Sequence, residues 1–144
     1  MSILFMLSGT SAYADDANPS GPKNNKLINV SQMEPSPLSL KSASRPSQVW
    51  NIATQGKYDF AGWSYGDTLY TNYKFKGKQS YAIYVRNTGS KKLTVKAKTF
   101  WHTFAKVELS GGSSQTFYVY TGDVGKEFYI TFDGNDFSFS GNIH

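Results

Sequence analysis

Cysteine is absent from the 144-residue sequence. Its absence excludes a disulfide framework, a thiolate metal site and a thiol nucleophile. Long apolar runs are missing too, since no segment approaches the roughly 18 consecutive apolar residues that a membrane-spanning helix needs. The sequence therefore predicts no transmembrane segment, and we expect a fold held together by a packed core alone.

Histidine is scarce, with only His102 and the last residue, His144. A Ser-His-Asp arrangement or a histidine metal site needs several converging groups. The Asp and Glu residues after position 49 lie mostly at breaks between strand-like segments, where Asp is a common turn residue. The sequence therefore predicts no catalytic residues, and we expect a protein that is not an enzyme.

Proline does not occur after position 46, and this divides the chain into compositionally different parts. The apolar residues 3–7, followed by small residues up to Ala12-Tyr13-Ala14, are typical of the end of a secretory signal peptide. The alternative is a disordered apolar tail. We assign residues 1–14 to a signal-peptide remnant, 15–48 to a disordered linker rich in Pro, Ser and Asn, and 49–144 to a globular domain. A signal peptide predicts a secreted, extracellular protein.

The globular part alternates apolar and polar residues in short segments that are separated by breaks containing Gly, Asn or Asp. A period of two with regularly spaced turn signals predicts antiparallel strands, and no segment carries the periodicity and capping signals of a helix. We expect an all-β fold: an antiparallel β-sandwich of about eight strands, of jelly-roll or immunoglobulin-like type. The strand candidates are Trp50 to Thr54, Lys57 to Trp63, Thr68 to Lys76, Ser80 to Asn87, Lys91 to Thr99, Trp101 to Leu109, Gln115 to Thr121, Lys126 to Phe132 and Phe137 to Ile143.

Strand parity also predicts which side chains face the core, because residues two apart share a face of a sheet. Their number is sufficient for a domain of this size without disulfides. The predicted inward residues are Tyr58, Phe60, Tyr73, Phe75, Ile83, Val85, Leu93, Val95, Val107, Leu109, Phe117, Val119, Phe128, Ile130, Phe132, Phe137, Phe139 and Ile143.

Three C-terminal segments carry a family resemblance: GGSSQTFYV at 111–119, EFYITF at 127–132 and FSGNI at 139–143. In this order they resemble the closing half of pre-peptidase C-terminal type domains, which are small bacterial β-sandwiches appended to secreted enzymes. The resemblance implies an accessory or ligand-binding role, sometimes assisted by calcium. The chain carries no peptidase segment beside these strands, so such a module would act alone.

A calcium site is the metal hypothesis that the sequence supports. Asp133, Asn135 and Asp136 place three oxygen-bearing side chains in one short loop, and calcium prefers oxygen ligands. The loop lacks the spacing and the distal Glu of an EF-hand, and the alternative is a plain turn. No other cofactor is expected.

Cations gather in the middle of the chain, where no Asp or Glu occurs between Asp67 and Glu108. The net charge is +5 and the calculated isoelectric point is about 9.3, which favours anionic partners. The alternative is a solvated face whose lysines protect an edge strand from aggregation. An anionic cell-wall polymer is the expected partner, and nucleic acid is not expected for an exported protein. The candidate residues, matched in strand parity, are Lys74 and Lys76 and then Lys92, Lys96 and Lys98.

Aromatic residues make up 16% of the sequence and give a second binding hypothesis. Rings exposed on a sandwich can stack on sugar rings, while the alternative is that they are ordinary outward-facing strand residues. The candidates for polysaccharide binding are Trp63, Tyr65, Tyr70 and Trp101, together with the neighbouring His102. Tyr118, Tyr120 and Tyr129 share the outward parity.

Together these features predict a secreted bacterial binding or surface module without enzymatic activity, which recognises carbohydrate or an anionic cell-envelope polymer. The alternative is a small cationic, bacteriocin-like protein that acts on the envelopes of other cells. The sequence leaves the oligomeric state open.

Overall fold

The computed structural model of the chain describes residues 26–28 and 44–144. The predicted signal peptide and most of the predicted linker lie outside these residues. Two parts of the linker are ordered into strands: Lys26–Ile28 forms β1, and Gln48 begins β2 (Gln48–Asn51). The β1 strand pairs with a strand of the globular part.

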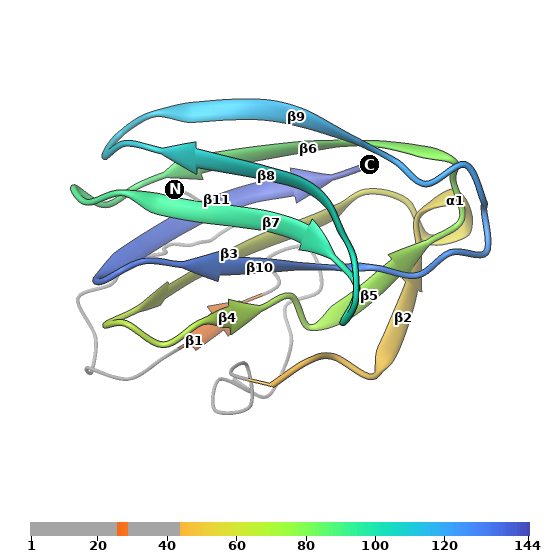
Figure 1. The fold of residues 1–144 in the computed structure, drawn as a ribbon, viewed down its shortest axis with the longest axis horizontal. Coiled ribbons are helices and arrows are strands. Elements are labelled where there is room, and N and C mark those ends of the chain that lie inside the picture. Colours follow the sequence, from red (N-terminus) through yellow and green to blue (C-terminus); the bar gives the residue numbers. More distant parts are fainter. Residues whose placement is uncertain (1–25, 29–43) are drawn as a thin grey trace.

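Two antiparallel sheets pack face to face as a sandwich (Figure 1). The five-stranded sheet has the order β1, β3 (Tyr58–Ser64), β11 (Phe137–Ile143), β6 (Ser80–Asn87) and β9 (Ser114–Tyr120). The four-stranded sheet has the order β4 (Leu69–Tyr70), β10 (Tyr129–Asp133), β7 (Leu93–Lys98) and β8 (Thr103–Leu109). The predicted all-β sandwich is confirmed.

The strand order identifies which type of sandwich this is. Counted along the chain from β3 and without β5, the eight sandwich strands take the order 1-8-3-6 in one sheet and 2-7-4-5 in the other. This is the arrangement of a jelly roll, in which two Greek keys wrap around one core. A short parallel pair, β2 with β5 (Tyr73–Lys76), lies beside the sandwich and is joined to the start of β10 by a bridge between Phe75 and Phe128.

The core fills the space between the sheets with aliphatic and aromatic side chains. Every residue predicted to face inward is buried in it except Tyr73 and Val107, which are partly buried against it. The ring of Phe132 from the four-stranded sheet stacks on that of Phe139 from the five-stranded sheet, with centroids 3.8 Å apart and planes at 9°. This stack joins the two layers at the centre of the sandwich.

Gly141 lies opposite Val85 and Phe60 in the five-stranded sheet. A Cβ atom there would approach the backbone oxygen of Tyr84 to 2.0 Å. Only glycine therefore fits this position without a shift of the neighbouring strand.

Two of the predicted strands were wrong in part. The segment Trp50 to Thr54 is not a single strand, because β2 ends at Asn51 and a one-turn helix, α1 (Ile52–Gln55), follows. The Asn51 side chain accepts hydrogen bonds from the backbone N–H groups of Ala53 and Thr54, at 2.9 and 3.2 Å. This is an N-cap, and it turns the backbone out of the extended conformation.

The predicted strand Thr68 to Lys76 is divided into β4 and β5. Thr71 lies between them, is buried, and forms hydrogen bonds that replace regular pairing. Its hydroxyl donates to the carbonyl of Tyr73 at 2.9 Å and accepts from the N–H of Ile130 at 3.2 Å. Hydroxyl side chains that bond nearby backbone groups compete with regular strand pairing in this way.

Candidate functional site

The β7–β8 hairpin carries a set of outward-facing lysines on an apolar base. Leu93, Val95 and Ala97 are fully buried, so the residues between them, including Lys96, face outward. Lys98 follows a register shift after Ala97 and pairs with Thr103. The sequence prediction that Lys96 and Lys98 lie on one solvent face therefore agrees with the geometry of the hairpin.

Lys96 and Lys106 occupy directly opposite positions on β7 and β8. Like charges placed directly opposite each other on one face of a sheet repel and lower stability. Within the part of the chain that the structure describes, no carboxylate oxygen lies within 4.0 Å of the ammonium group of Lys96 or of Lys98. In this like-charged pair Lys96 therefore has no acid beside it, whereas Lys106 forms an ion pair with Glu108.

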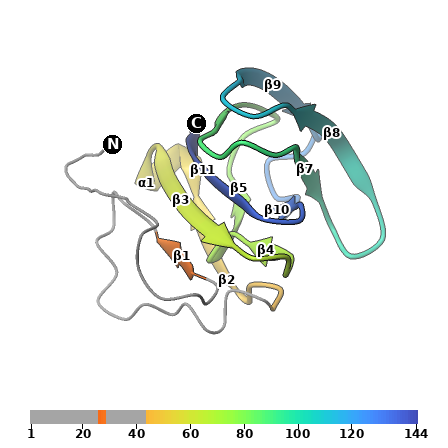
Figure 2. The same cartoon turned by 90° about the vertical axis from the view of Figure 1, so that its left-hand side faces the viewer.

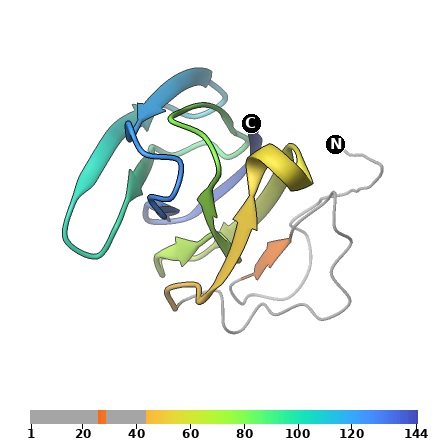
Figure 3. The ribbon, with the colours of Figure 1, turned by 90° about the vertical axis from the view of Figure 1, so that its right-hand side faces the viewer.

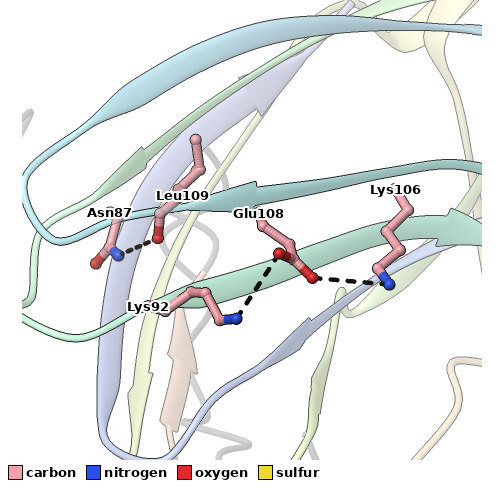
Figure 4. A network of polar contacts seen from close by, with 5 residues as sticks. All are labelled: Asn87, Lys92, Lys106, Glu108 and Leu109. Atoms are coloured by element: carbon pink, nitrogen blue, oxygen red, sulfur yellow. Dashed lines mark hydrogen bonds and ion pairs between the residues drawn. The ribbon is translucent and has the colours of Figure 1, made fainter.

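Glu108 forms ion pairs with two lysines near the open end of the hairpin, away from the turn. Its carboxylate lies 3.7 Å from the ammonium groups of both Lys92 and Lys106 (Figure 4). All three side chains are about half exposed or more, and such pairs contribute little to stability in water. Of the predicted cations on this hairpin, Lys92 therefore lies beside an acid, whereas no described carboxylate lies beside Lys96 or Lys98.

A buried amide holds the same end of the hairpin to the opposite sheet. The amide nitrogen of Asn87, at the end of β6, donates to the carbonyl of Leu109 at 3.0 Å (Figure 4). It also donates to the carbonyl of Lys91 at 2.7 Å. Its oxygen accepts from the N–H of Gly89 at 3.0 Å. Asn87 is fully buried, so these bonds fix the spacing between β6 and the β7–β8 hairpin.

Arg45 adds a further cation at the turn end of the hairpin. Its guanidinium lies 4.3 Å from the centroid of the Phe100 ring, where it makes a cation–π contact. Arg45 also lies near Tyr129, which pairs with Lys98 in the sheet. Burial raises the pKa of the Tyr129 hydroxyl, while the charge of Arg45 acts to lower it. We call Arg45, Lys96, Lys98 and Lys106 the cationic face.

The hairpin ends in an exposed aromatic turn. The N–H of Thr99 donates to the carbonyl of His102 at 2.7 Å, and the Thr99 hydroxyl accepts from the N–H groups of Trp101 and His102 at 3.2 and 2.9 Å. Phe100 is 51% exposed and Trp101 is 88% exposed. Their rings meet edge to face with centroids 4.4 Å apart. We call Phe100 and Trp101 the aromatic tip.

The aromatic candidates do not gather on one surface. Trp63 is half-buried on the outer side of β3, beside Tyr65 at 5.9 Å between centroids, and both belong to the five-stranded side. Tyr70 lies on the four-stranded sheet, 5.6 Å from Tyr129. Trp101 and the exposed His102 lie at the hairpin turn. Sequence parity cannot reveal this division, because it does not say which sheet a strand joins.

Lys74 and Lys76 lie apart from the cationic face, on β5, which pairs with β2. Lys74 forms an ion pair with Glu127 at 3.1 Å. The lysines of β5 and β7 therefore lie on two separate surfaces, and Arg86, which lies between them in the sequence, is exposed on β6 of the five-stranded sheet. Of these, the surface on β7 combines lysines without an acid beside them with the exposed rings of the hairpin turn.

The proposed calcium ligands are held only in part. The Asp133 carboxylate accepts a hydrogen bond from the Thr68 hydroxyl, and Asn135 and Asp136 are exposed. Within residues 26–28 and 44–144, no three His, Cys, Asp or Glu side chains group closely enough to hold a metal ion. Because an amide oxygen can be a calcium ligand, the calcium hypothesis stays a prediction.

The five-stranded sheet has an outer face of a different kind. Tyr118 and Tyr120 are 70% and 72% exposed on its edge strand β9, next to Ala82 and Ser80 of β6. Hydroxyl and amide side chains of Thr116 and Asn142 flank Tyr84 in the neighbouring row. Rings and neutral polar groups predominate on this face, with Arg86 and Asp59 among its charged residues, whereas the β7–β8 hairpin carries several lysines.

Sequence reasoning missed Arg45 and Phe100. Arg45 was assigned to the linker, and no pattern connects it with a hairpin so far along the chain. Phe100 had a usable signal, since Phe100-Trp101 occupies a turn where Gly, Asn, Asp, Pro or Ser are the usual residues. Two large rings are unusual in such a turn.

No family model matches the chain, and no curated protein matches it. The resemblance to pre-peptidase C-terminal type domains stays a prediction based on the segments quoted above. None of the helices in the described residues is long and apolar enough to cross a membrane.

Proposed function

We propose that the protein is a secreted, non-enzymatic binding module that holds an anionic cell-envelope polymer on its cationic face. The observation that supports this most directly is the opposed pair Lys96 and Lys106 beside Lys98, with no acid among the described residues near Lys96 or Lys98. A polymer with phosphate or carboxylate groups at regular intervals would relieve the repulsion by lying across both strands.

The geometry suits a polymer better than a single small anion. The cationic groups lie on the exposed side of the β7–β8 hairpin and beside its turn, where each contact with an anion is screened by water and weak. Several such contacts made together by one chain add up through effective concentration. Binding should therefore grow with polymer length and weaken as salt is added.

The test measures binding to polyphosphate and to polygalacturonate, with neutral dextran as the reference polymer. Replacing both Lys96 and Lys98 by Gln should weaken binding about tenfold, at roughly 1 kcal/mol or less for each exposed contact. The matched control replaces Lys57 and Lys126, which changes the charge by the same amount elsewhere. Equal binding by the two double variants, or binding that is insensitive to salt, would refute the proposal.

A neutral glycan on the five-stranded sheet is the second candidate, because Tyr118 and Tyr120 lie on the same side of one strand with both rings largely exposed. Flat rings beside hydroxyl and amide groups suit the apolar faces and hydroxyls of sugars. Retention on a neutral polysaccharide that is lost in Tyr118→Ala/Tyr120→Ala, and kept in Lys96→Gln/Lys98→Gln, would favour this candidate.

A further inference from the structure

Neither the packing of the core nor the proposed anion binding accounts for the aromatic tip. Trp101 is 88% exposed and Phe100 51%. Burying a side chain of this size stabilises by about 1.5–3 kcal/mol relative to leaving it in water, so a fold gains nothing from displaying two together. The anion-binding role of the lysines does not need these rings either.

The turn that carries the tip is held in one conformation. Thr99 makes backbone and side-chain hydrogen bonds to Trp101 and His102 across it. The His102 ring packs edge to face on Phe104 at 4.6 Å, and Phe104 in turn packs near Phe128 of the core. A tip that is fixed before contact loses little conformational freedom when it binds.

The hairpin also places the tip where it can reach a surface. In two views the connection between β7 and β8 projects away from the remaining strands of the sandwich (Figures 2 and 3). Nothing among the described residues covers Trp101, whose one ring contact is with Phe100. The two rings can therefore enter an apolar layer without a change in the fold.

Cations surround the base of the tip. Lys98 precedes Phe100 by two residues, Arg45 lies against the Phe100 ring, and Lys96 and Lys106 follow on the outer side of the hairpin. No acid occurs in the sequence from 68 to 107. Rings that enter the interface between water and hydrocarbon, with Lys or Arg at the level of the headgroups, are the combination that binds an anionic bilayer.

We propose that the aromatic tip docks the protein on an anionic phospholipid bilayer, with Phe100 and Trp101 in the interface and Arg45, Lys98, Lys96 and Lys106 on the headgroups. The occupant is a lipid surface rather than a soluble anion, because a soluble anion would not take up the rings. This inference goes beyond the proposed polymer binding, which uses the lysines and not the tip.

The first test is co-sedimentation of the full chain with vesicles of phosphatidylcholine, with and without phosphatidylglycerol. We expect binding to the anionic vesicles and little to the neutral ones. Phe100→Ala/Trp101→Ala should weaken that binding at least tenfold, and its polyphosphate binding should be unchanged. Trp63→Ala, which removes a half-buried ring from the other sheet, is the matched control and should bind as the unaltered protein does.

Tryptophan fluorescence gives a readout that electrostatic adsorption alone would not move. Trp50 is buried, with its ring N–H bonded to the carbonyl of Gly56 at 2.9 Å, and Trp63 is half-buried on the other sheet, so the part of a blue shift that Trp101→Phe removes reports on Trp101. Trp101→Phe should abolish the shift while keeping most of the binding. No binding to anionic vesicles, binding without a shift, or undiminished binding by Phe100→Ala/Trp101→Ala would each overturn the inference. If the unaltered protein bound anionic vesicles but not polyphosphate, only the proposed function would be overturned.

Discussion

The two outer faces of the sandwich differ in chemistry although they cover the same core. The face of the four-stranded sheet presents lysines, with Lys96 set against Lys106 and an aromatic tip at its end. The face of the five-stranded sheet presents Tyr118 and Tyr120 with neutral hydroxyl and amide groups around Tyr84. The inward side chains specify the fold. The outward side chains of the two sheets can therefore differ in chemistry without changing it.

The difference also shows where the fold tolerates an unfavourable arrangement. The repulsive lysine pair lies on an edge hairpin of the four-stranded sheet, whereas the five-stranded sheet carries its tightest packing at Gly141 in an interior strand. An exposed repulsion costs a few tenths of a kcal/mol to about 1 kcal/mol, and an overpacked core costs more. The like-charged pair therefore lies where its cost to the fold is small.

The largest expected effect comes from disrupting the hydrophobic core that the two faces share. Phe132→Ala removes one ring of the stack between the sheets, and deletion of a buried Phe costs about 3–5 kcal/mol. Urea unfolding should show this loss, and binding on both faces should fail together near the new midpoint. Tyr118→Ala, which removes an exposed ring, is the control and should leave the midpoint nearly unchanged. If one face kept its binding after the other had unfolded, the sheets would not form one cooperative unit.

The next effect comes from the polar link between the sheets. Asn87→Asp keeps the shape of the side chain but replaces its N–H donors, which bond the carbonyls of Lys91 and Leu109, with an acceptor. Leaving buried groups without partners costs about 1–3 kcal/mol, and more with a charge. We expect a loss of about 3 kcal/mol at neutral pH, measured by urea unfolding.

Asn87→Asp should lose less at a pH low enough to protonate the new carboxyl, since a neutral acid regains one donor. The exposed substitution Thr116→Asp, on the other sheet's outer face, is the control. A stability of Asn87→Asp equal to that of the unaltered protein would mean that Asn87 does not hold the β7–β8 hairpin to β6.

Strand existence and the inward set could be predicted because each depends on local alternation. Ser80–Asn87 and Phe137–Ile143 were predicted with the bounds that the structure has. The helix at Ile52 was not predicted because four residues show no periodicity, and its only signal was the capping side chain of Asn51. The division of Thr68 to Lys76 depends on Thr71 bonding Ile130, a residue far away in the sequence.

The candidate site was harder to predict than the fold, because it depends on contacts between residues far apart in the sequence. Parity placed Lys96 and Lys98 on one face, but only the pairing of β7 with β8 sets Lys96 against Lys106. Trp63 and Trp101 share an aromatic character and not a surface, because sheet membership follows from long-range pairing. Local signals thus identify which residues face outward, and the topology decides which of them meet.

A smaller effect would sharpen the electrostatic side of the comparison. Lys96→Ala removes one member of the repulsive pair, so we expect unfolding stability to stay equal or to rise by a few tenths of a kcal/mol. Lys74→Ala, which removes the ion pair with Glu127, should lower stability by a similar small amount. Both changes should shrink in high salt, because screening weakens each interaction. A marked loss in Lys96→Ala would mean that Lys96 supports the fold rather than a ligand.

The smallest effect concerns Asp59, a partly buried acid on the outer face of the five-stranded sheet. Burial raises the pKa of Asp59 above its ordinary value, and Lys57, 3.8 Å away, acts in the opposite direction. A raised pKa in the folded state means that Asp59 costs no stability while it is protonated, below its unfolded pKa of about 3.9. The cost appears as the pH rises through the folded pKa and is constant above it.

Asp59→Asn removes the charge, so its melting temperature should rise relative to the unaltered protein as the pH increases from about 3 to about 6. The control is Asp67→Asn, which makes the same substitution at an exposed position outside the sheet. A difference in melting temperature that is the same at every pH would show that the two effects cancel, and one that falls as the pH rises would show that Lys57 outweighs burial at Asp59. The five-stranded face would then favour a negative charge at this position, and its contrast with the cationic face would be greater than we infer.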